Sequence, residues 1–320
     1  MCNYQRRVRI FHHEQHKKHC KRSSILKLQT PEGLLEGHSA CSDFLQKEAS
    51  NLLLTQAKLD PFAQEALLAE VKPVFSDSDN CKLKKKPSKD YVFDVLCRSN
   101  LNSAPGTDGI TSLLYKEHWD ILGDPLHQVI TAIAEGEKLT TSQRTSLMVF
   151  GTKPKKPLSI KPEDKRRISL LNSDFKLCTA LEADMLKQMF THTLSPFQLV
   201  AGKDRRIHHG INKARDCINA VSKSGCALVD LDFIAAFDFT VLVWVLKVMR
   251  AKGVCEEVLN RLTNIYDNCI TIPVINNIPG KPLNVQGPWD GSPLELIRSC
   301  CFLTENFRES LSALCQLLVQ

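Results

Sequence analysis

The segment at residues 226–238 constrains the fold more than any other part of this chain. It reads CALVDLDFIAAFD, an apolar run that places Asp232 at its carboxyl end, immediately before a predicted helix. Unbroken Val, Leu and Ala runs are typical of buried strands in α/β folds, and ligands gather beyond the carboxyl ends of such strands. Asp232 is therefore placed for chemistry, although many α/β proteins also end a strand in aspartate for structural reasons.

Composition indicates a globular protein with a basic bias. With 320 residues, 43% of them apolar, the chain can bury a sizeable core in one large or two modest domains. The 42 Lys and Arg exceed the 35 Asp and Glu, and the formal net charge of +7 is concentrated in a few segments. This distribution indicates a polyanionic partner.

The sequence contains neither a membrane-span pattern nor a secretion signal. It has no run of about 18 apolar residues, and its amino terminus is polar and basic. Thirteen cysteines, an odd number scattered through apolar positions such as Cys97, Cys178 and Cys217, indicate free thiols rather than disulfides. We expect an intracellular protein of the nucleus, the cytoplasm or both, neither secreted nor associated with a membrane.

Residues 1–38 form a basic segment that we predict to be a mobile leader. Its first 22 residues combine seven Lys and Arg with four His and Cys20. A metal cluster is the alternative, but no paired Cys-x-x-Cys accompanies these residues and their spacing fits no zinc module. The leader is therefore the preferred interpretation.

Residues from about 39 to 72 show helical periodicity, and residues 39–79 are predicted to form a helical lead-in, in which Asp60 and Pro61 are typical of a helix start. The basic run KLKKKPSK at residues 82–89 then precedes a short predicted helix around Val92, Phe93 and Leu96. The basic run fits either a nuclear-import signal or a solvated linker.

A turn is predicted at residues 103–110, SAPGTDGI, because proline presets one backbone angle and two glycines permit positive φ. Helices are expected at about 112–122 and 125–135. Asp124 and Pro125 would open the second helix and Gly136 would close it.

A strand is predicted at residues 146–150, followed by the cationic loop GTKPKKP at 151–157 and a second short strand at 165–172. Together they form a hairpin with a basic tip. Lysine supplies a point charge and arginine a bidentate fork for phosphate oxygens, so such a hairpin can clamp phosphates. An ordinary solvated hairpin is the alternative.

Five motifs follow one another along the chain. They are PGTDGI at 105–110 with Tyr115, Lys116 and Trp119; the strand with its lysine loop; RRISLLNSDFK at 166–176; Gln198, Gly202 and Arg205; and the block from Asp232 to Asp238. In this order they resemble the reverse transcriptase of non-LTR (LINE-type) retrotransposons. The resemblance covers roughly residues 80–294 and is weaker in the helical lead-in.

The resemblance implies an α/β (α+β) fold, that of a right-hand polymerase with a helical N-terminal extension. Residues 80–225 would be the fingers and residues 226–294 the first part of the palm, followed by a divergent tail at 295–320. The complete family enzyme is an RNA-directed DNA polymerase, a nucleotidyltransferase that uses Mg²⁺ and dNTPs to extend a DNA primer on an RNA template.

Site residues follow from the same resemblance. Asp232 matches the first catalytic aspartate, which binds two Mg²⁺ ions in the family. The backbone carbonyl of Phe233 is expected to complete the adjoining metal position, with Val229 as the alternative. Phe237 matches the aromatic residue under the incoming sugar, although a core role is the alternative, and Asp238 is expected to cap the next helix. The residues that match the triphosphate-binding positions of the fingers are Lys153, Lys155 and Arg166, and which lysine binds stays open.

The chain also departs from the family pattern. Arg167 replaces a proline that stiffens the strand entry. The next palm motif, Gln-Gly-x-Pro-Leu-Ser, appears as DGSPLE at 290–295, where Gly291 and Pro293 match positions that contact template and nucleotide. The two acids of this segment should repel nucleic acid and weaken binding. A competing alignment through QG at 286–287 puts the Pro-Leu pair at the wrong distance.

The sequence ends at Gln320 without the Tyr- or Phe-Ala-Asp-Asp tetrapeptide that supplies the family's other metal carboxylates. Asp230 lies too far back along the strand to replace them, so we expect weak or absent Mg²⁺ binding and an inactive isolated chain. The expected function is a reverse-transcriptase-like fragment of a non-LTR retrotransposon. Two alternatives remain: a non-enzymatic RNA- or DNA-binding protein derived from a retroelement, and an unrelated metal-dependent α/β enzyme that uses Asp230, Asp232 and Asp238.

Overall fold

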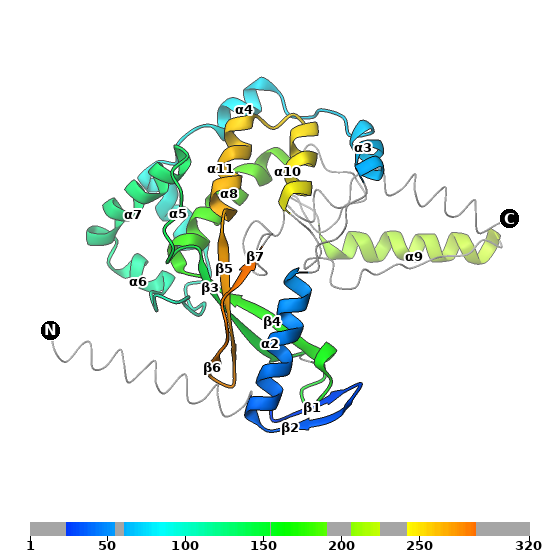
Figure 1. The fold of residues 1–320 in the computed structure, drawn as a ribbon. Coiled ribbons are helices and arrows are strands. Elements are labelled where there is room, and N and C mark those ends of the chain that lie inside the picture. The colour runs from blue at the N-terminus through cyan, green and yellow to red at the C-terminus, as the bar shows by residue number, and fades with distance from the viewer. Residues whose placement is uncertain (1–23, 55–60, 154, 191–205, 225–241, 286–320) are drawn as a thin grey trace.

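The structure, a computed structural model, describes residues 24–54, 61–153, 155–190, 206–224 and 242–285. Helices and strands mix along the described chain, and this confirms the α+β fold class expected from the sequence. In Figure 1 most helices gather at one end of a mixed sheet, and a small hairpin with the long helix α2 lies at the other end.

The larger sheet brings together segments that are far apart in sequence. Its strands run in the order β4 (Lys165–Leu170), β3 (Thr145–Thr152), β5 (Cys269–Ile275) and β6 (Ile278–Pro279), and β7 (Leu283–Val285) also pairs with β5. β3 and β4 are antiparallel, which confirms the predicted hairpin. β3 and β5 are parallel, so the predicted fingers and palm share this sheet.

Side chains on β5 alternate strictly between buried and partly buried, as the two-residue period of a strand requires. The buried face includes the polar Thr271, whose hydroxyl accepts a hydrogen bond of 2.9 Å from Ser146 Oγ on β3. This contact satisfies two buried hydroxyls and fixes the pairing of the central strands.

One hydrophobic core joins the described helices of the predicted fingers to those of the predicted palm. Fully buried Phe175 lies edge-on to Tyr266, with ring centroids 6.1 Å apart. Burial of each large apolar side chain contributes about 1.5–3 kcal/mol, so the two parts stabilise each other. The helices around this core are α4 (Asp77–Leu83), α5 (Lys89–Arg98), α7 (Trp119–Ala134), α8 (Ser173–Phe190), α10 (Leu242–Ala251) and α11 (Glu256–Tyr266).

The N-terminal part of the described chain packs on the sheet. β1 (Lys27–Thr30) and β2 (Gly33–Glu36) form a hairpin that leads into α2 (His38–Leu54), and Leu28, Leu45 and Ile275 meet in a second apolar cluster. The predicted leader at residues 1–38 therefore differs from the structure at its end, where a folded hairpin occupies residues 27–36. In β1, Leu28 and Thr30 are buried and alternate with exposed Lys27 and Gln29, but one apolar residue in four is too short a pattern to predict a strand from sequence.

The turn between β5 and β6 connects this N-terminal part to the sheet. Asn276 and Asn277 have φ of 53° and 67°, the left-handed conformation that two-residue hairpins need and that asparagine tolerates. The side chain of Asn276 accepts from Ile25 N–H and donates to Ile25 C=O, both at 2.7 Å. The side-chain amide of Asn276 thus makes the two hydrogen bonds to Ile25 that the backbone of a neighbouring strand would otherwise make.

The helix boundary predicted at Asp124 and Pro125 is wrong. α6 (Ser112–Glu117) ends at His118, α7 begins at Trp119, and Pro125 lies inside α7. Gly123 is buried against the ring of Trp119, and Leu126, Ile130 and Ile133 face the core, so packing overrides the proline signal. Gly136, with φ of 101°, closes the helix as expected.

Two other sequence expectations are confirmed. The helix predicted to start at Pro61 is α3 (Pro61–Ala69), and the cysteines that the structure describes are all free thiols. Of these, Cys178 is buried and Cys217 lies exposed on α9 (Ile207–Ser224). Among the described residues, no helix is long and apolar enough to cross a membrane.

Candidate nucleotide and nucleic-acid interface

The β3–β4 hairpin carries the cations that the sequence singled out. Gly151 lies opposite Arg166 in the ladder and Thr152 lies opposite Lys165. Beyond the last pair, Lys153 N–H donates to the carbonyl of Asp164 at 2.9 Å and closes the base of the tip loop. The short 3₁₀ helix η1 (Pro162–Asp164) returns the loop into β4.

Asp164 holds the tip loop from inside. Its side chain is 3% exposed and accepts from Ser159 Oγ at 2.7 Å and from Lys156 Nζ at 2.9 Å. Lys153 Nζ lies 3.9 Å from the same carboxylate. The hydrogen bond from Ser159, followed by the one from Lys156, lowers the pKa of Asp164 below its ordinary value.

Lys165 holds the same loop from the strand side. Its ammonium donates to Ser159 C=O at 2.6 Å and to Thr152 Oγ1 at 3.3 Å. Burial lowers the pKa of Lys165 below its ordinary value. The negative charge of Asp164 partly offsets this shift. The outer edge of the loop is anchored as well, because Gln29 N–H on β1 donates to Ile160 C=O at 2.9 Å.

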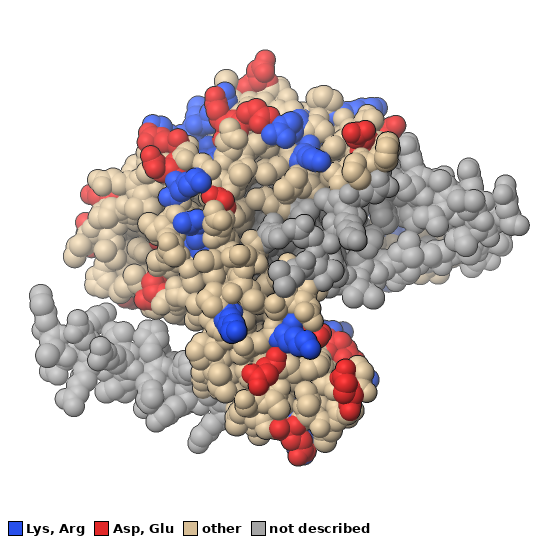
Figure 2. Space-filling model, in the orientation of Figure 1, with Lys and Arg blue, Asp and Glu red and all other residues tan. Residues whose placement is uncertain are grey.

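Other cations of the tip have no acidic partner in the described part of the chain. Lys155, Lys161 and Arg166 are exposed and form no ion pair with the residues that the structure describes. Leu158 between them is 92% exposed. On the face shown in Figure 2, basic and acidic side chains are interspersed over the helical part. The exposed cations make the tip a local phosphate-binding candidate.

The turn at residues 103–110 docks against the start of α8. Asn172 is 1% exposed, and its Oδ1 accepts from Thr107 Oγ1 at 3.2 Å and from Asp108 N–H at 3.4 Å. Its Nδ2 donates to the carbonyl of Ser142 at 3.0 Å. One buried amide thus joins the turn, the segment before β3 and the entry to α8.

Two further contacts hold this turn in place. Ser173 Oγ donates to Ile110 C=O at 2.7 Å, and Lys176 Nζ donates to Ala104 C=O at 3.0 Å and to Ser103 Oγ at 3.1 Å. Burial lowers the pKa of Lys176. Gly109, with φ of 72°, supplies the positive φ that the sequence predicted for this turn.

Three titratable side chains in and near this turn interact electrostatically: Asp108, Tyr115 and Asp174. Burial raises the pKa of Asp108, and the hydrogen bond from Ile110 N–H partly offsets the effect. Burial also raises the pKa of Tyr115, with the charges of Asp174 and Asp108 adding to it. Asp174 accepts from Gln143 Nε2 at 2.9 Å. Tyr115 therefore stays a neutral phenol under ordinary conditions.

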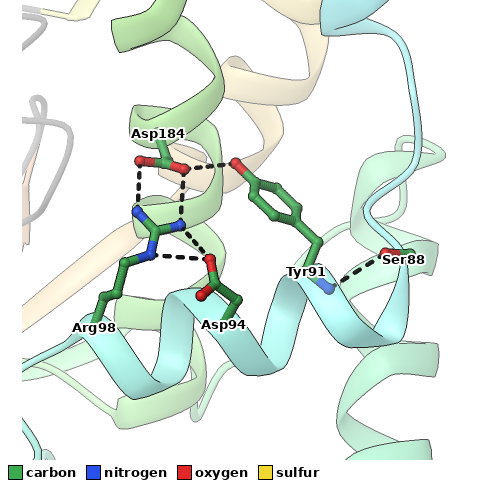
Figure 3. Close-up of polar contacts among 5 residues, drawn as sticks. All are labelled: Ser88, Tyr91, Asp94, Arg98 and Asp184. Carbon is green, nitrogen blue, oxygen red and sulfur yellow. Dashed lines mark hydrogen bonds and ion pairs between the residues drawn. The ribbon is translucent and has the colours of Figure 1, made fainter.

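A polar brace joins α5 to α8 (Figure 3). Arg98 donates to both oxygens of Asp184 at 3.1 Å, and Tyr91 Oη donates to Asp184 Oδ2 at 2.7 Å. Arg98 Nε also donates to Asp94 at 3.0 Å. The hydrogen bond from Arg98 is the main cause that lowers the pKa of Asp184, and that from Tyr91 adds to it.

A buried ion pair joins α8 to α11. The side chains of Arg261 and Glu182 are 4% and 7% exposed. Arg261 Nε lies 2.7 Å from Glu182 Oε1, but the two atoms are not aligned for a hydrogen bond. Arg261 Nη2 donates to Glu182 Oε2 at 2.8 Å and to Leu83 C=O at 3.0 Å. Burial raises the pKa of Glu182, and the neighbouring guanidinium opposes that shift.

The structure places three of the residues predicted for the site and leaves five undescribed. Lys153, Lys155 and Arg166 lie on one hairpin, with Lys153 turned toward Asp164. The predicted residues outside the described part are Asp232, Phe233, Phe237, Gly291 and Pro293. Within the described part, no group of three or more His, Cys, Asp or Glu side chains could hold a metal ion.

Sequence reasoning missed the two residues that organise the described interface, Asp164 and Asn172. The acidic pair Glu163 and Asp164 in an otherwise basic loop was a usable signal, since a carboxylate among lysines has several partners within reach, but only the fold shows that Asp164 is the buried member. Asn172 belonged to a quoted motif, but its contacts with the turn depend on long-range packing that no local pattern encodes.

No protein-family model matches the sequence. A comparison with curated proteins finds similarity to a Xenopus laevis protein described as the transposon TX1 uncharacterized 149 kDa protein, 26% identical over 301 residues. The match covers 92% of this chain and 22% of that protein, so the chain spans about a fifth of the length of its relative.

Proposed function

We propose that this chain is a reverse-transcriptase-like part of a polymerase encoded by a non-LTR retrotransposon, in which the β3–β4 hairpin binds phosphate groups. The observation that carries the proposal is the hairpin tip. Its loop is held by Asp164 and Lys165, while Lys155 and Arg166 are exposed. Exposed cations on an anchored loop can contact phosphate oxygens without reordering.

Two further observations support the proposal. The turn PGTDGI and the segment RRISLLNSDFK each resemble the family separately in sequence, and they contact each other through Gly106 and Asn172. The similarity to the TX1 transposon protein supports an origin in a transposable element. Because the chain spans about a fifth of that relative, activity, substrates and cofactor are proposed for a longer protein.

Each predicted residue has a role in this proposal. Arg166, together with Lys153 or Lys155, holds the triphosphate of a dNTP or the backbone of the RNA template. Asp232 and the carbonyl of Phe233 would hold Mg²⁺, which stabilises charge during phosphoryl transfer. The remaining proposed contacts are Phe237 with the sugar, and Gly291 and Pro293 with template and nucleotide.

A second candidate function is metal-independent binding of RNA or DNA by a protein derived from a retroelement. The hairpin favours it, because Lys155 and Arg166 need no metal ion to contact phosphate. The two functions differ in their response to Mg²⁺. Primer extension by a longer protein that contains this chain would favour the first function, and RNA binding without Mg²⁺ by a longer protein that does not extend a primer would favour the second.

The first test measures binding of a fluorescent single-stranded RNA oligonucleotide at increasing NaCl, for wild type, Lys155→Gln and Arg166→Gln. Each lost phosphate contact should make the slope of log K against log salt shallower by about 0.7. The matched control is Lys85→Gln, an exposed lysine beyond α4 with no ion-pair partner in the described part of the chain. Hairpin variants that bind like the Lys85 control would overturn the proposal.

The same variants are then titrated with dATP. A selective loss of dATP binding assigns the hairpin to the triphosphate, whereas a selective loss of RNA binding assigns it to the template backbone. Primer extension on an RNA template with Mg²⁺ and dNTPs tests the polymerase. Extension by the wild type that survived Asp232→Asn would contradict the proposed role of Asp232.

A further inference from the structure

The lysines of the β3–β4 tip differ in whether they have an acidic partner. Lys156 bonds Asp164 at 2.9 Å, and Lys153 lies 3.9 Å from the same oxygen. Lys155, between them in sequence, is exposed and has no ion-pair partner among the described residues. The side chains of Lys156 and Lys153 are also exposed, at 60% and 42%, so the loop divides neighbouring lysines by pairing and not by exposure.

The burial of Asp164 makes this division stable. Its carboxylate is 3% exposed, and a charge removed from water needs partners of its own. Ser159 Oγ satisfies one oxygen and Lys156 the other, while the backbone of Asp164 closes the hairpin through Lys153 N–H. Because the ammonium of Lys156 is already paired with this carboxylate, the positive charge that it offers to an external phosphate is partly neutralised.

We propose that Asp164 is a positioning residue for phosphate binding, which pairs with Lys156 and Lys153 and leaves the unpaired Lys155 and Arg166 to contact the ligand. The inference rests on the proposed function and deepens it, because it selects Lys155 over Lys153 as the ligand-binding lysine. Asp164 determines which lysines contact the phosphate and does not contact the phosphate itself.

The test is a double-mutant cycle between Asp164→Asn and Lys155→Gln, read as RNA affinity at low salt. In the wild-type background Lys155→Gln should weaken binding about fivefold, the effect of one lost phosphate contact. In Asp164→Asn the released lysines replace Lys155, so the same substitution should cost less than about twofold. Equal losses in both backgrounds would refute a positioning role.

Glu163→Gln is the matched control. Glu163 is the exposed neighbour of Asp164 on η1, has no ion-pair partner in the part of the chain that the structure describes, and loses the same charge. Asp164→Asn should steepen the salt dependence more than Glu163→Gln, because two lysines become available besides the charge change. Identical salt slopes for the two variants would assign the effect to net charge and contradict the proposal.

A second comparison avoids any folding defect of the Asp164 variant. In otherwise wild-type protein, Lys155→Gln should weaken RNA binding about fivefold. Lys156→Gln keeps an amide donor for Asp164 and should change RNA binding by less than about twofold. Equal losses from the two substitutions would overturn the inference even if Asp164→Asn does not fold.

The outcomes separate this inference from the proposed function. RNA affinity that does not depend on Lys155 or Arg166 would defeat the proposed function itself. Affinity that depends on Lys155 and Arg166, with the Asp164 and Glu163 variants indistinguishable, would defeat the positioning role and leave phosphate binding intact.

Discussion

Asn172, buried at the entry to α8, lies directly against Gly106 in the turn at residues 103–110. A Cβ added to Gly106 would come 2.6 Å from the carbonyl carbon of Leu171 and would also clash with Asn172. Two segments separated by the β3–β4 hairpin thus meet without space for a methyl group. This contact fixes where the turn sits beside the strand that leads to the candidate interface.

Gly106→Ala should destabilise the protein by about 1–3 kcal/mol, because the clash is with backbone atoms that cannot rotate away. Urea unfolding measures the change. Gly151→Ala is the control, since its Cβ would meet only Ile168 Cδ1 at 3.4 Å. Equal stabilities of the two variants would show that the turn can move.

Asn172→Ala should cost about 2–4 kcal/mol, because it removes buried hydrogen bonds to Thr107, Asp108 and Ser142 together. Asn264→Ala removes a single exposed bond to Gly136 C=O and should change stability by less than about 1 kcal/mol. Thermal and urea unfolding of both variants check this ranking. A reversed order would mean that the amide does not organise the turn.

Asp184→Asn should reduce stability by about 1–2 kcal/mol at neutral pH, because its hydrogen bonds from Arg98 and Tyr91 lose their ionic acceptor. The pKa of Asp184 is lower in the folded protein, so its contribution is present above its unfolded pKa of about 3.9. As the pH falls through the folded pKa, the contribution disappears.

Urea unfolding at neutral and strongly acidic pH compares Asp184→Asn with wild type. The difference should be largest at neutral pH and should vanish under acid. Asp94→Asn is the control, since Asp94 is 61% exposed and pairs with Arg98 on the same helix, a contact expected to contribute about 0.3–0.5 kcal/mol. A difference between Asp184→Asn and wild type that persisted in acid would contradict the assignment.

Glu182→Leu should destabilise the protein by about 3–5 kcal/mol, because it leaves the guanidinium of Arg261 buried without its counter-ion. Adding Arg261→Met to this variant should restore much of the loss, since an apolar pair of similar volume needs no counter-ion. Chemical unfolding of both variants measures the recovery. A double variant no more stable than Glu182→Leu would mean that Arg261 acts mainly through Leu83 C=O.

Local patterns in the sequence predicted much of the described structure. The two short strands around the lysine loop form the expected hairpin, and Pro61 begins a helix as expected. Gly109 and Gly136 adopt the positive φ expected from their places in a turn and at a helix end. These features depend on residues near each other in the chain, so strand alternation and the special backbone angles of Pro and Gly suffice to predict them.

Tertiary structure decided the features that depend on distant residues. Packing of Gly123 against Trp119 kept Pro125 inside α7, and parallel pairing brought β5 beside β3. The roles of Asp232, Phe233 and Phe237 remain predictions, because the described residues do not include them.

The candidate interface also combines a feature set by local sequence with a feature set by tertiary structure. Sequence by itself determined that the hairpin tip is cationic, because charge is a property of each residue. Only the folded loop decided which lysines have an acidic partner: buried Asp164 pairs with Lys156 and Lys153, whereas Lys155 has no ion-pair partner among the described residues. The physical reason is that a carboxylate removed from water requires nearby donors, and which donors it meets depends on how the chain returns on itself.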